Sequence, residues 1–216
     1  MNRLEICPSI LSADFLNLHK DLKELDKAGA KILHFDVMDG HFVPNISFGP
    51  GILKSIARNF NFFLDVHLMV ERPILFIEEF FKSGASSLTF HIEAKDDILE
   101  CINRIKKFNL KCGIAINPKT SLEEVISFIN LVDILLIMTV NPGFSGQSFM
   151  EDVLEKVEKI RVLNSSLKIM VDGGINDKNI SKALKAGAHW FVAGSSIFNS
   201  DDVLKSFKNL KEALLV

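Results

Sequence analysis

Short apolar runs recur eight times along this chain of 216 residues, and a longer amphipathic segment separates each run from the next. Most of the runs are apolar at every position rather than at alternate positions. A strand with this pattern is buried on both faces, as in a parallel sheet that is covered by helices. The predicted strands are Leu4–Ile10, Ile32–Val37, Phe62–Met69, Ser87–His91, Cys112–Ile116, Asp133–Val140, Lys168–Val171 and Trp190–Ala193.

The segments between these runs repeat their apolar residues at helical spacing. In the first segment, apolar residues recur at three- and four-residue steps between Phe15 and Ala28. Gly29 then offers the left-handed backbone conformation that ends many helices, and Gly84 and Gly187 end two later segments in the same way. The other predicted helices are Gly51–Ala57, Pro73–Phe81, Ile98–Phe108, Leu122–Ile129, Val153–Leu163, Asn179–Ala186 and Val203–Leu214.

Eight strand–helix units share the 216 residues, which leaves 216/8 = 27 residues for each unit. Such units build either an open doubly wound sheet or a closed (β/α)₈ barrel. Polar residues at the C-terminal ends of strands 1, 2, 3, 7 and 8 favour the barrel, because a closed barrel brings all eight strand ends to one mouth. The sequence therefore predicts a single α/β domain, residues 1–216, folded as a (β/α)₈ TIM barrel with its active site at that mouth.

Charge and apolar content exclude several classes of protein. With 25 Lys and Arg against 27 Asp and Glu, the net charge of −2 offers no basic excess for binding nucleic acid. The longest apolar runs, such as Ile134–Met138, are too short to span a bilayer, and the N-terminus lacks the apolar stretch of a signal peptide. Cys7, Cys101 and Cys112 form no Cys-x-x-Cys pair, which indicates a reducing compartment. We expect a cytoplasmic protein that contacts neither nucleic acid nor membrane.

Four polar side chains at strand ends give the strongest indication of chemistry. His34 and Asp36 lie two residues apart on one strand and so share a face, His67 ends the next strand, and Asp172 ends the seventh. Two imidazoles and two carboxylates at one barrel mouth predict a site for one divalent metal ion per chain. Zn²⁺ is favoured, with Fe²⁺, Mn²⁺ or Co²⁺ as alternatives. A single buried histidine is more often structural, so the prediction depends on the coincidence of all four residues.

Glycines follow strands 6, 7 and 8 directly. They lie in the loop Asn141–Gln147, in the pair Gly173 and Gly174, and beside Ser195 at Gly194. Glycine lets backbone N–H groups approach an anion closely, and the loops after strands 7 and 8 of a TIM barrel often bind phosphate. One such loop would say little, since glycine ends many strands, but three in succession predict a phosphate site.

Methionines near the top of three strands have two interpretations. Met38, Met69 and Met138 are core filler by default, or they form an apolar lid around a reacting centre. Three further polar residues near the strand ends are interpreted as structural, namely Asp65, His91 and Glu93.

The predicted groups suit a reaction on a phosphorylated substrate. Two carboxylates on distant strands can remove a proton from one face of a substrate and return it on the other. A metal beside them would stabilise the charge of an enediolate oxygen. This chemistry describes epimerisation next to a carbonyl, although metal-assisted hydrolysis or aldol cleavage could use similar groups.

Long motifs along nearly the whole chain resemble those of the ribulose-phosphate 3-epimerase family. The motifs are Pro8-Ser-Ile-Leu-Ser-Ala-Asp-Phe15, His34-Phe-Asp-Val-Met-Asp-Gly-His-Phe-Val-Pro-Asn45, Val66-His-Leu-Met-Val70, Met138-Thr-Val-Asn-Pro-Gly-Phe144, Val171-Asp-Gly-Gly-Ile175 and Phe191-Val-Ala-Gly-Ser195. The resemblance implies a barrel enzyme that interconverts D-ribulose 5-phosphate and D-xylulose 5-phosphate in the pentose phosphate pathway. Its partner would be the sugar-phosphate substrate, and assembly as a homo-oligomer stays open.

The resemblance also implies roles for individual residues. The metal ligands would be His34, Asp36, His67 and Asp172. Two of these ligands, Asp36 and Asp172, would exchange the proton at C3 through an enediolate, one on each face. The substrate contacts would be Ser9, His67, Gly143, Phe144, Ser145, Gly146, Gly173, Gly174, Gly194 and Ser195. The methionines Met38, Met69 and Met138 match a cap over the substrate in this family.

One position departs from the family pattern, and two other functions stay open. The family loop usually reads Gly-Phe-Gly-Gly-Gln, whereas this chain has Gly143-Phe-Ser-Gly-Gln147. If that position needs a positive φ, Ser145 is strained by about 1 kcal/mol. The alternative functions are an epimerase of another ketose phosphate, such as D-allulose 6-phosphate, and a non-catalytic barrel that binds a sugar phosphate.

Overall fold

Eight parallel strands form one sheet in the computed structural model, which describes residues 4–215. The predicted domain boundaries include residues 1–3 and 216, which lie outside the described part. Along the sheet the strand order is β1-β8-β7-β6-β5-β4-β3-β2. The strands are β1 (Glu5–Pro8), β2 (Ile32–Met38), β3 (Phe63–Met69), β4 (Ser87–His91), β5 (Lys111–Ile116), β6 (Ile134–Met138), β7 (Lys168–Asp172) and β8 (Trp190–Ala193).

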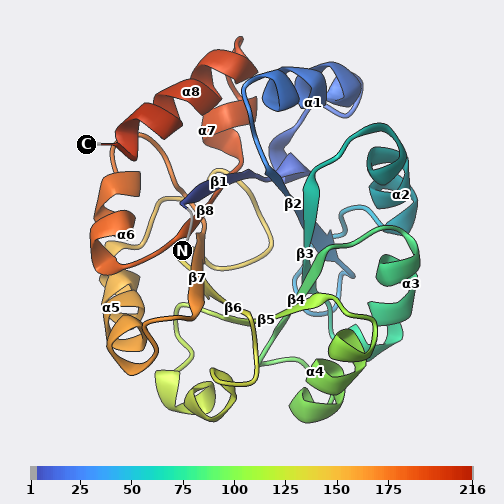
Figure 1. Ribbon diagram of the computed structural model, residues 1–216, viewed down its shortest axis with the longest axis vertical. Helices are drawn as coiled ribbons and strands as arrows, with labels where there is room; N and C mark the ends of the chain where they lie inside the picture. Colours follow the sequence, from blue (N-terminus) through green and yellow to red (C-terminus); the bar gives the residue numbers. More distant parts are fainter. Residues whose placement is uncertain (1–3, 216) are drawn as a thin grey trace.

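The seam between β1 and β2 closes this sheet. These two strands share no ladder, and a single parallel bridge joins Ser9 to His34 just beyond the end of β1. Figure 1 shows the strands around the centre of the molecule with the helices outside them. The structure is therefore a (β/α)₈ barrel, which confirms the predicted fold class.

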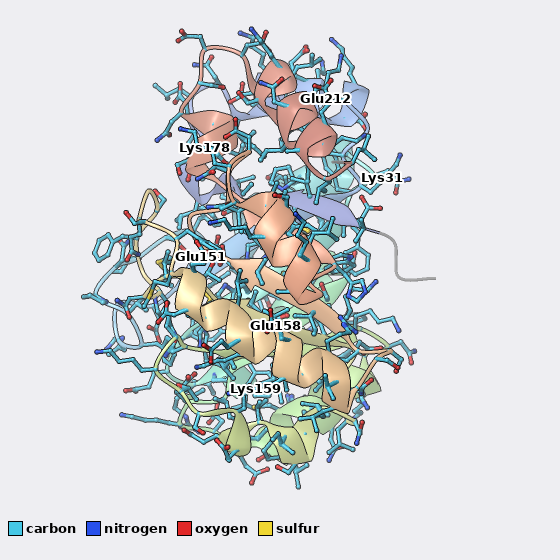
Figure 2. All side chains as sticks on the ribbon, turned by 90° about the vertical axis from the view of Figure 1, so that its left-hand side faces the viewer. Lys31, Glu151, Glu158, Lys159, Lys178 and Glu212 are labelled. Atoms are coloured by element: carbon cyan, nitrogen blue, oxygen red, sulfur yellow. The ribbon has the colours of Figure 1, made fainter. Side chains whose placement is uncertain are left out.

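The helices form the outer ring. They are α1 (Leu18–Lys27), α2 (Pro50–Asn59), α3 (Ile77–Lys82), α4 (Ile98–Lys107), α5 (Leu154–Leu163), α6 (Ile180–Ala186), α7 (Ser195–Phe198) and α8 (Val203–Ala213). Their outer faces are charged, as Glu158 and Lys159 on α5 illustrate in Figure 2. Among the described helices, none has the length and apolarity that a bilayer crossing requires.

Strand alternation separates two packing layers. On β2, Phe35 belongs to the apolar layer between strands and helices, whereas Ile32 belongs to the cluster inside the barrel. His34 and Asp36 share the inward face with Ile32, because side chains alternate along a strand. The apolar cluster inside the barrel consists of Cys7, Ile32, Ala115, Ile134, Leu136, Met138, Val140, Met170, Trp190 and Val192. His34 and Asp36 follow Ile32 on this face and so lie nearer the C-terminal end of the barrel.

Three predicted glycine helix stops are confirmed, but the predicted helix Leu122–Ile129 is wrong. Gly29, Gly84 and Gly187 all adopt positive φ angles at the ends of α1, α3 and α6. The segment Leu122–Ile129 instead forms two 3₁₀ turns, η3 (Leu122–Glu124) and η4 (Ile126–Phe128). Its buried residues are spaced by three and then four, which predicted an α-helix, but its β-branched residues and serine are weak helix formers.

The first and third helices differ most from the prediction, while the remaining predicted helices differ by one or two residues at their ends. The first helix begins at Leu18, and Phe15 lies before it with its ring 5.2 Å from that of Phe48. The predicted helix Pro73–Phe81 divides into a 3₁₀ turn, η2 (Pro73–Leu75), and α3. The four-residue helix α7 directly follows β8 and was not predicted, since four residues carry no helical periodicity.

Candidate active site

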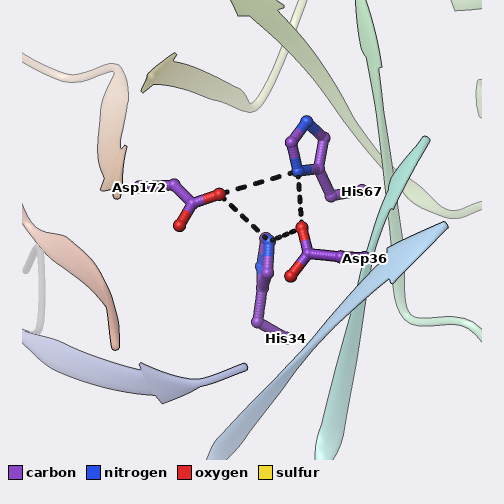
Figure 3. Close-up of side chains that lie close together, drawn as sticks. All are labelled: His34, Asp36, His67 and Asp172. Atoms are coloured by element: carbon purple, nitrogen blue, oxygen red, sulfur yellow. Dashed lines mark hydrogen bonds and ion pairs between the residues drawn. The ribbon is translucent and has the colours of Figure 1, made fainter. Parts of the chain in front are cut away.

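Four side chains from three strands meet at the C-terminal end of the barrel. They are His34 and Asp36 on β2, His67 on β3 and Asp172 on β7, and we call them the donor cluster. One nitrogen or carboxylate oxygen from each residue lies within 4.8 Å of the others (Figure 3). The parallel register explains part of this arrangement, because Asp36 and His67 are direct neighbours across β2 and β3. The structure thus brings together all four predicted metal ligands.

The donor atoms of the cluster have spacings that suit a metal ion. Asp36 Oδ1 lies 2.9 Å from His67 Nδ1 and 3.3 Å from His34 Nε2. Asp172 Oδ2 lies 3.8 Å from the same His67 nitrogen and 3.9 Å from the same His34 nitrogen. Tetrahedral ligands at zinc–ligand distances of about 2.0–2.2 Å stand about 3.4 Å from one another. The buried His34 Nε2 also lacks a hydrogen-bond partner, as expected of an atom that ligates a cation. The cluster can therefore hold a divalent metal.

The two cluster carboxylates have opposite pKa shifts. Burial alone would raise the pKa of Asp36, but the neighbouring imidazoles of His34 and His67 hold that pKa well below its usual value. Burial and the nearby carboxylate of Asp36 raise the pKa of Asp172 to about 7. Asp36 is therefore ionised at neutral pH while Asp172 can carry a proton, which is the division that a base and an acid require.

The buried carboxylates in and beside the donor cluster favour a positive charge next to them. Burial disfavours the charged form of His34, yet the carboxylates of Asp36 and Asp65 outweigh burial and raise the His34 pKa well above its usual value. Closely spaced carboxylates repel one another unless a proton or a cation lies among them. A divalent ion at the donor atoms would compensate the same negative charge.

Both imidazoles are also held from behind, by residues that the sequence indicated only as structural. His34 Nδ1 lies 2.7 Å from Asp65 Oδ2, and Ser87 donates to the other oxygen of Asp65 at 2.5 Å. His67 Nε2 lies 2.8 Å from His91 Nε2. The outer nitrogen of a metal-binding histidine usually has such a partner, which fixes the ring orientation and the tautomer.

A cavity of about 460 Å³, including its open mouth, lies above the donor cluster. Asp36 and Asp172 line it, together with the three methionines Met38, Met69 and Met138. His34 and His67 do not line it, because both rings are fully buried beneath the carboxylates. The implied contact between His67 and substrate therefore has no support in this geometry.

Ser9 lines the same cavity but has a partner already. Its hydroxyl donates to Asp36 Oδ2 at 2.5 Å and accepts the backbone N–H of Leu11 at 3.3 Å. Ser12 also lines the cavity, and its buried hydroxyl has no hydrogen-bond partner. A Cβ on Gly194 would lie 2.6 Å from that hydroxyl, so glycine lets the two chains approach. Sequence reasoning missed Ser12, although it lies only three residues after Ser9.

The glycine loops, as we call Asn141–Gln147, Gly173–Gly174 and Gly194–Ser195, form the opposite wall of the cavity. The predicted residues that line this wall are Gly143, Phe144, Ser145, Gly146, Gly173, Gly174, Gly194 and Ser195. A Cβ on Gly174 would lie 2.9 Å from the backbone oxygen of Gln147, which shows how closely two of the loops pack. The described lining residues include no Lys, Arg or His. An anion at this wall would therefore meet backbone N–H groups and hydroxyls.

The expected strain at Ser145 is absent. Asn109 is the only residue other than glycine with a positive φ in the described chain, so Ser145 adopts an ordinary conformation. Gly143 and Gly146 on either side of it have φ angles of 121° and 77°. The glycines flanking Ser145 supply the unusual backbone of this loop, and the serine is accommodated without cost.

Comparison with known proteins gives the same assignment as the fold and the site. A (β/α)₈ barrel with a buried cluster of two histidines and two aspartates, under a cavity walled by glycine loops, is typical of barrel enzymes and could hold a metal and an anion. The model of the "Ribulose-phosphate 3 epimerase family" matches residues 5–198. This chain belongs to the ribulose-phosphate 3-epimerase family, and it is therefore an epimerase.

Individual relatives agree with the family assignment. The chain is 42% identical over 217 residues to the ribulose-phosphate 3-epimerase of Chlamydia trachomatis, covering 98% of this chain and 91% of the relative. It is 44% identical over 200 residues to the cytoplasmic isoform from Oryza sativa, covering 91% and 88%. The solved structure of 3-hexulose-6-phosphate synthase from Salmonella typhimurium is similar with a TM-score of 0.77 at 15% identity, covering 98% of this chain and 99% of that one. At that identity the likeness shows the fold alone.

Proposed function

We propose that this protein is a metal-dependent epimerase that interconverts D-ribulose 5-phosphate and D-xylulose 5-phosphate. One observation carries the mechanism: Asp36 and Asp172 come from strands separated by β1 and β8, yet both face one cavity. Inversion at a carbon requires one group to take a proton from one face and another to return a proton to the opposite face. Membership of the family supports the choice of substrate.

The two carboxylates suit this exchange because they reach the cavity from different strands. In one direction, ionised Asp36 removes the proton at C3 and leaves a planar enediolate. Asp172, in its protonated form, then donates its proton to the other face. In the reverse direction the two residues exchange roles. Ser9 holds the Asp36 carboxylate in place through its hydroxyl.

One divalent metal ion would be held by His34, Asp36, His67 and Asp172. When bound, it would stabilise the negative charge that develops on the substrate oxygen during proton removal. The mixed nitrogen and oxygen donors suit Zn²⁺ best, and Fe²⁺, Mn²⁺ and Co²⁺ share these preferences. Met38, Met69 and Met138 would cover the reacting carbons with apolar surface.

The glycine loops would bind the phosphate group. Their backbone N–H groups would supply the hydrogen bonds, because the described lining residues include no cationic side chain. Ser195 begins α7 directly after β8, where TIM barrels commonly bind phosphate.

We also propose that residues 1–216 act as one catalytic domain in the cytoplasm, within the pentose phosphate pathway. The name of the rice relative, a cytoplasmic isoform, supports the location. The proposed substrate pair supports the pathway.

The proposed substrate can be tested by assaying D-ribulose 5-phosphate and D-allulose 6-phosphate side by side with the purified protein. The proposal expects a kcat/KM for ribulose 5-phosphate that exceeds the value for allulose 6-phosphate by at least about 100-fold. A reversed preference would establish the alternative epimerase. Tight binding of either sugar without turnover would establish a non-catalytic sugar-phosphate barrel.

Substitution of Gly146 by valine is expected to raise KM by about 10–100-fold, with a smaller effect on kcat. Gly146 has a φ of 77°, and a Cβ there meets no protein atom within 4 Å, so the change strains the loop without a clash in the folded protein. Loss of one hydrogen bond to a charged group is worth about 1.5–3 kcal/mol, which gives this range.

The neighbouring change Ser145→Gly provides the control, because Ser145 already has an ordinary φ. Its KM should stay within about twofold of the wild-type value. Steady-state kinetics of both variants would decide the matter, and an unchanged KM in Gly146→Val would place the phosphate elsewhere.

A further inference from the structure

A third histidine, which lies outside the donor cluster, contacts one of the cluster's two histidines. His91 ends β4 and is fully buried, with its Nε2 atom 2.8 Å from His67 Nε2. The ring centroids lie 5.0 Å apart and the ring planes are inclined by 28°. The ring of Phe42 covers His91 with its centroid 4.7 Å away. The contact is thus a fixed one, closed to bulk water.

Glu93 contacts the other ring nitrogen of His91, so that His67, His91 and Glu93 form a continuous series of contacts. His91 Nδ1 lies 3.1 Å from Glu93 Oε2. The other oxygen of Glu93 accepts the backbone N–H of Asn117 at 2.9 Å and the hydroxyl of Thr120. Burial would raise the pKa of Glu93, but hydrogen bonds from His91, Thr120 and Asn117 lower it to about 2. Glu93 is therefore an ionised acceptor.

The loop that contacts Glu93 is itself anchored. Lys156 on α5 donates to the carbonyl oxygens of Pro118 at 2.7 Å and of Thr120 at 2.5 Å. Glu93 is thus held from two sides, by its own strand end and by the loop after β5. A carboxylate fixed in this way gives His91 one preferred orientation.

Hydrogen-bond geometry determines where the protons lie in the series His67, His91 and Glu93. Two imidazole nitrogens at 2.8 Å need one donor and one acceptor between them. A cation at the donor cluster takes the lone pair of His67 Nδ1, so the proton of a neutral His67 lies on Nε2. His67 then donates to His91 Nε2, and His91 donates from Nδ1 to Glu93.

We propose that His91 and Glu93 are positioning residues for the metal site: they hold His67 in the tautomer and ring orientation that direct its Nδ1 lone pair at the cation. The inference deepens the proposed function and depends on its metal requirement. Asp65 has the matching place behind His34, but through a direct carboxylate contact. Each histidine of the metal site is therefore positioned from its outer nitrogen: His34 directly by a carboxylate, and His67 through His91, which in turn contacts a carboxylate.

The test is the affinity of the metal-stripped protein for Zn²⁺, measured by competition with a chromophoric chelator in the absence of substrate. His91→Leu removes the acceptor and should weaken Zn²⁺ binding by about 10–100-fold. His91→Gln keeps an acceptor near the Nε2 position and should restore the affinity to within about threefold of wild type. Glu93→Gln, nearly isosteric, should give an intermediate loss and serves if His91→Leu does not fold. The absorption spectrum of bound Co²⁺ should change in the same order.

Ile105→Ala is the matched control for lost stability, since Ile105 is fully buried in α4 and belongs to the apolar layer between strands and helices. It should lower the melting temperature and leave the Zn²⁺ affinity unchanged. Wild-type affinity within twofold in both His91→Leu and Glu93→Gln would overturn the inference. A wild-type protein that binds Zn²⁺ without epimerising ribulose 5-phosphate would overturn the proposed function and leave this inference standing.

Discussion

Replacement of Asp172 by asparagine is expected to lower kcat by at least about 10²–10⁴-fold, the range assigned to general acid–base catalysis. Asparagine keeps the shape of the side chain but can no longer exchange a proton, and it removes one negative charge from the donor cluster. Asp36→Asn should have an effect of the same order, because inversion uses both faces of the enediolate. The measurement is steady-state kinetics in each direction of the reaction.

Isotope exchange separates the two roles. In D₂O the wild type should place deuterium at C3 of the epimerised product. A variant that retains one carboxylate and its metal should exchange the C3 proton of one epimer without inverting it. Near-normal epimerisation by both asparagine variants would disprove the assignment.

Asp133→Asn is the matched control for these two variants. Its carboxylate accepts the backbone N–H of Cys112 at 2.9 Å and pairs with Lys111, at the opposite end of the barrel from the cavity. The change removes a hydrogen-bonded carboxylate without touching the site, so kcat should stay near the wild-type value.

Removal of the metal is expected to abolish turnover. The purified protein should carry about one divalent ion per chain, because the four donor atoms form one cluster of the right spacing. Treatment with a chelator should inactivate the enzyme, and addition of Zn²⁺, Fe²⁺, Mn²⁺ or Co²⁺ should restore activity to different extents. Elemental analysis provides the metal content, and a fully active preparation without metal would refute the requirement.

A ligand variant checks that this loss arises at the donor cluster. His67→Asn should weaken metal binding while the barrel stays folded, since asparagine can still hydrogen-bond to Asp36. His34→Ala is a poorer choice, because it would leave the fully buried carboxylate of Asp65 without its imidazole partner. An uncompensated buried charge costs about 3–5 kcal/mol of folding stability. Circular dichroism would distinguish loss of metal from loss of fold.

The sequence was sufficient for the barrel and for the donor cluster. Strand periodicity placed His34 and Asp36 on one face, and barrel closure was the one assumption needed to bring Asp172 near them. That assumption holds because eight parallel strands with covered faces and short connections have few other arrangements. The periodicity of apolar residues was therefore enough to predict which strand ends carry the site residues.

Contacts between side chains could not be predicted from the spacing of apolar and polar residues in the sequence. Asp65 and His91 are ordinary inward residues by periodicity. The parallel register places Asp65 beside His34, whereas His91 lies two residues beyond the register partner of His67 and reaches it through its side chain. The conformation of Ser145 depends on how the flanking glycines take up the turn, which a comparison of residue types does not reveal. The spacing of Leu122, Val125 and Ile129 is that of an α-helix, yet the segment forms two short 3₁₀ turns, so here the apolar spacing was a misleading guide.

The seam between β1 and β2 couples the assembly of the barrel to the assembly of its site. Elsewhere in the described sheet, neighbouring strands share a ladder, whereas this seam has the Ser9–His34 bridge and the hydrogen bond from Ser9 to Asp36. The weakest joint of the ring is therefore made from residues of the site. Opening of the seam would separate Ser9 from Asp36 and move the donor residues apart. A metal ion or substrate bound at the site would therefore also hold β1 and β2 together. Because a ligand that binds only the closed barrel stabilises it, occupation of the site is expected to stabilise the seam between β1 and β2 as well.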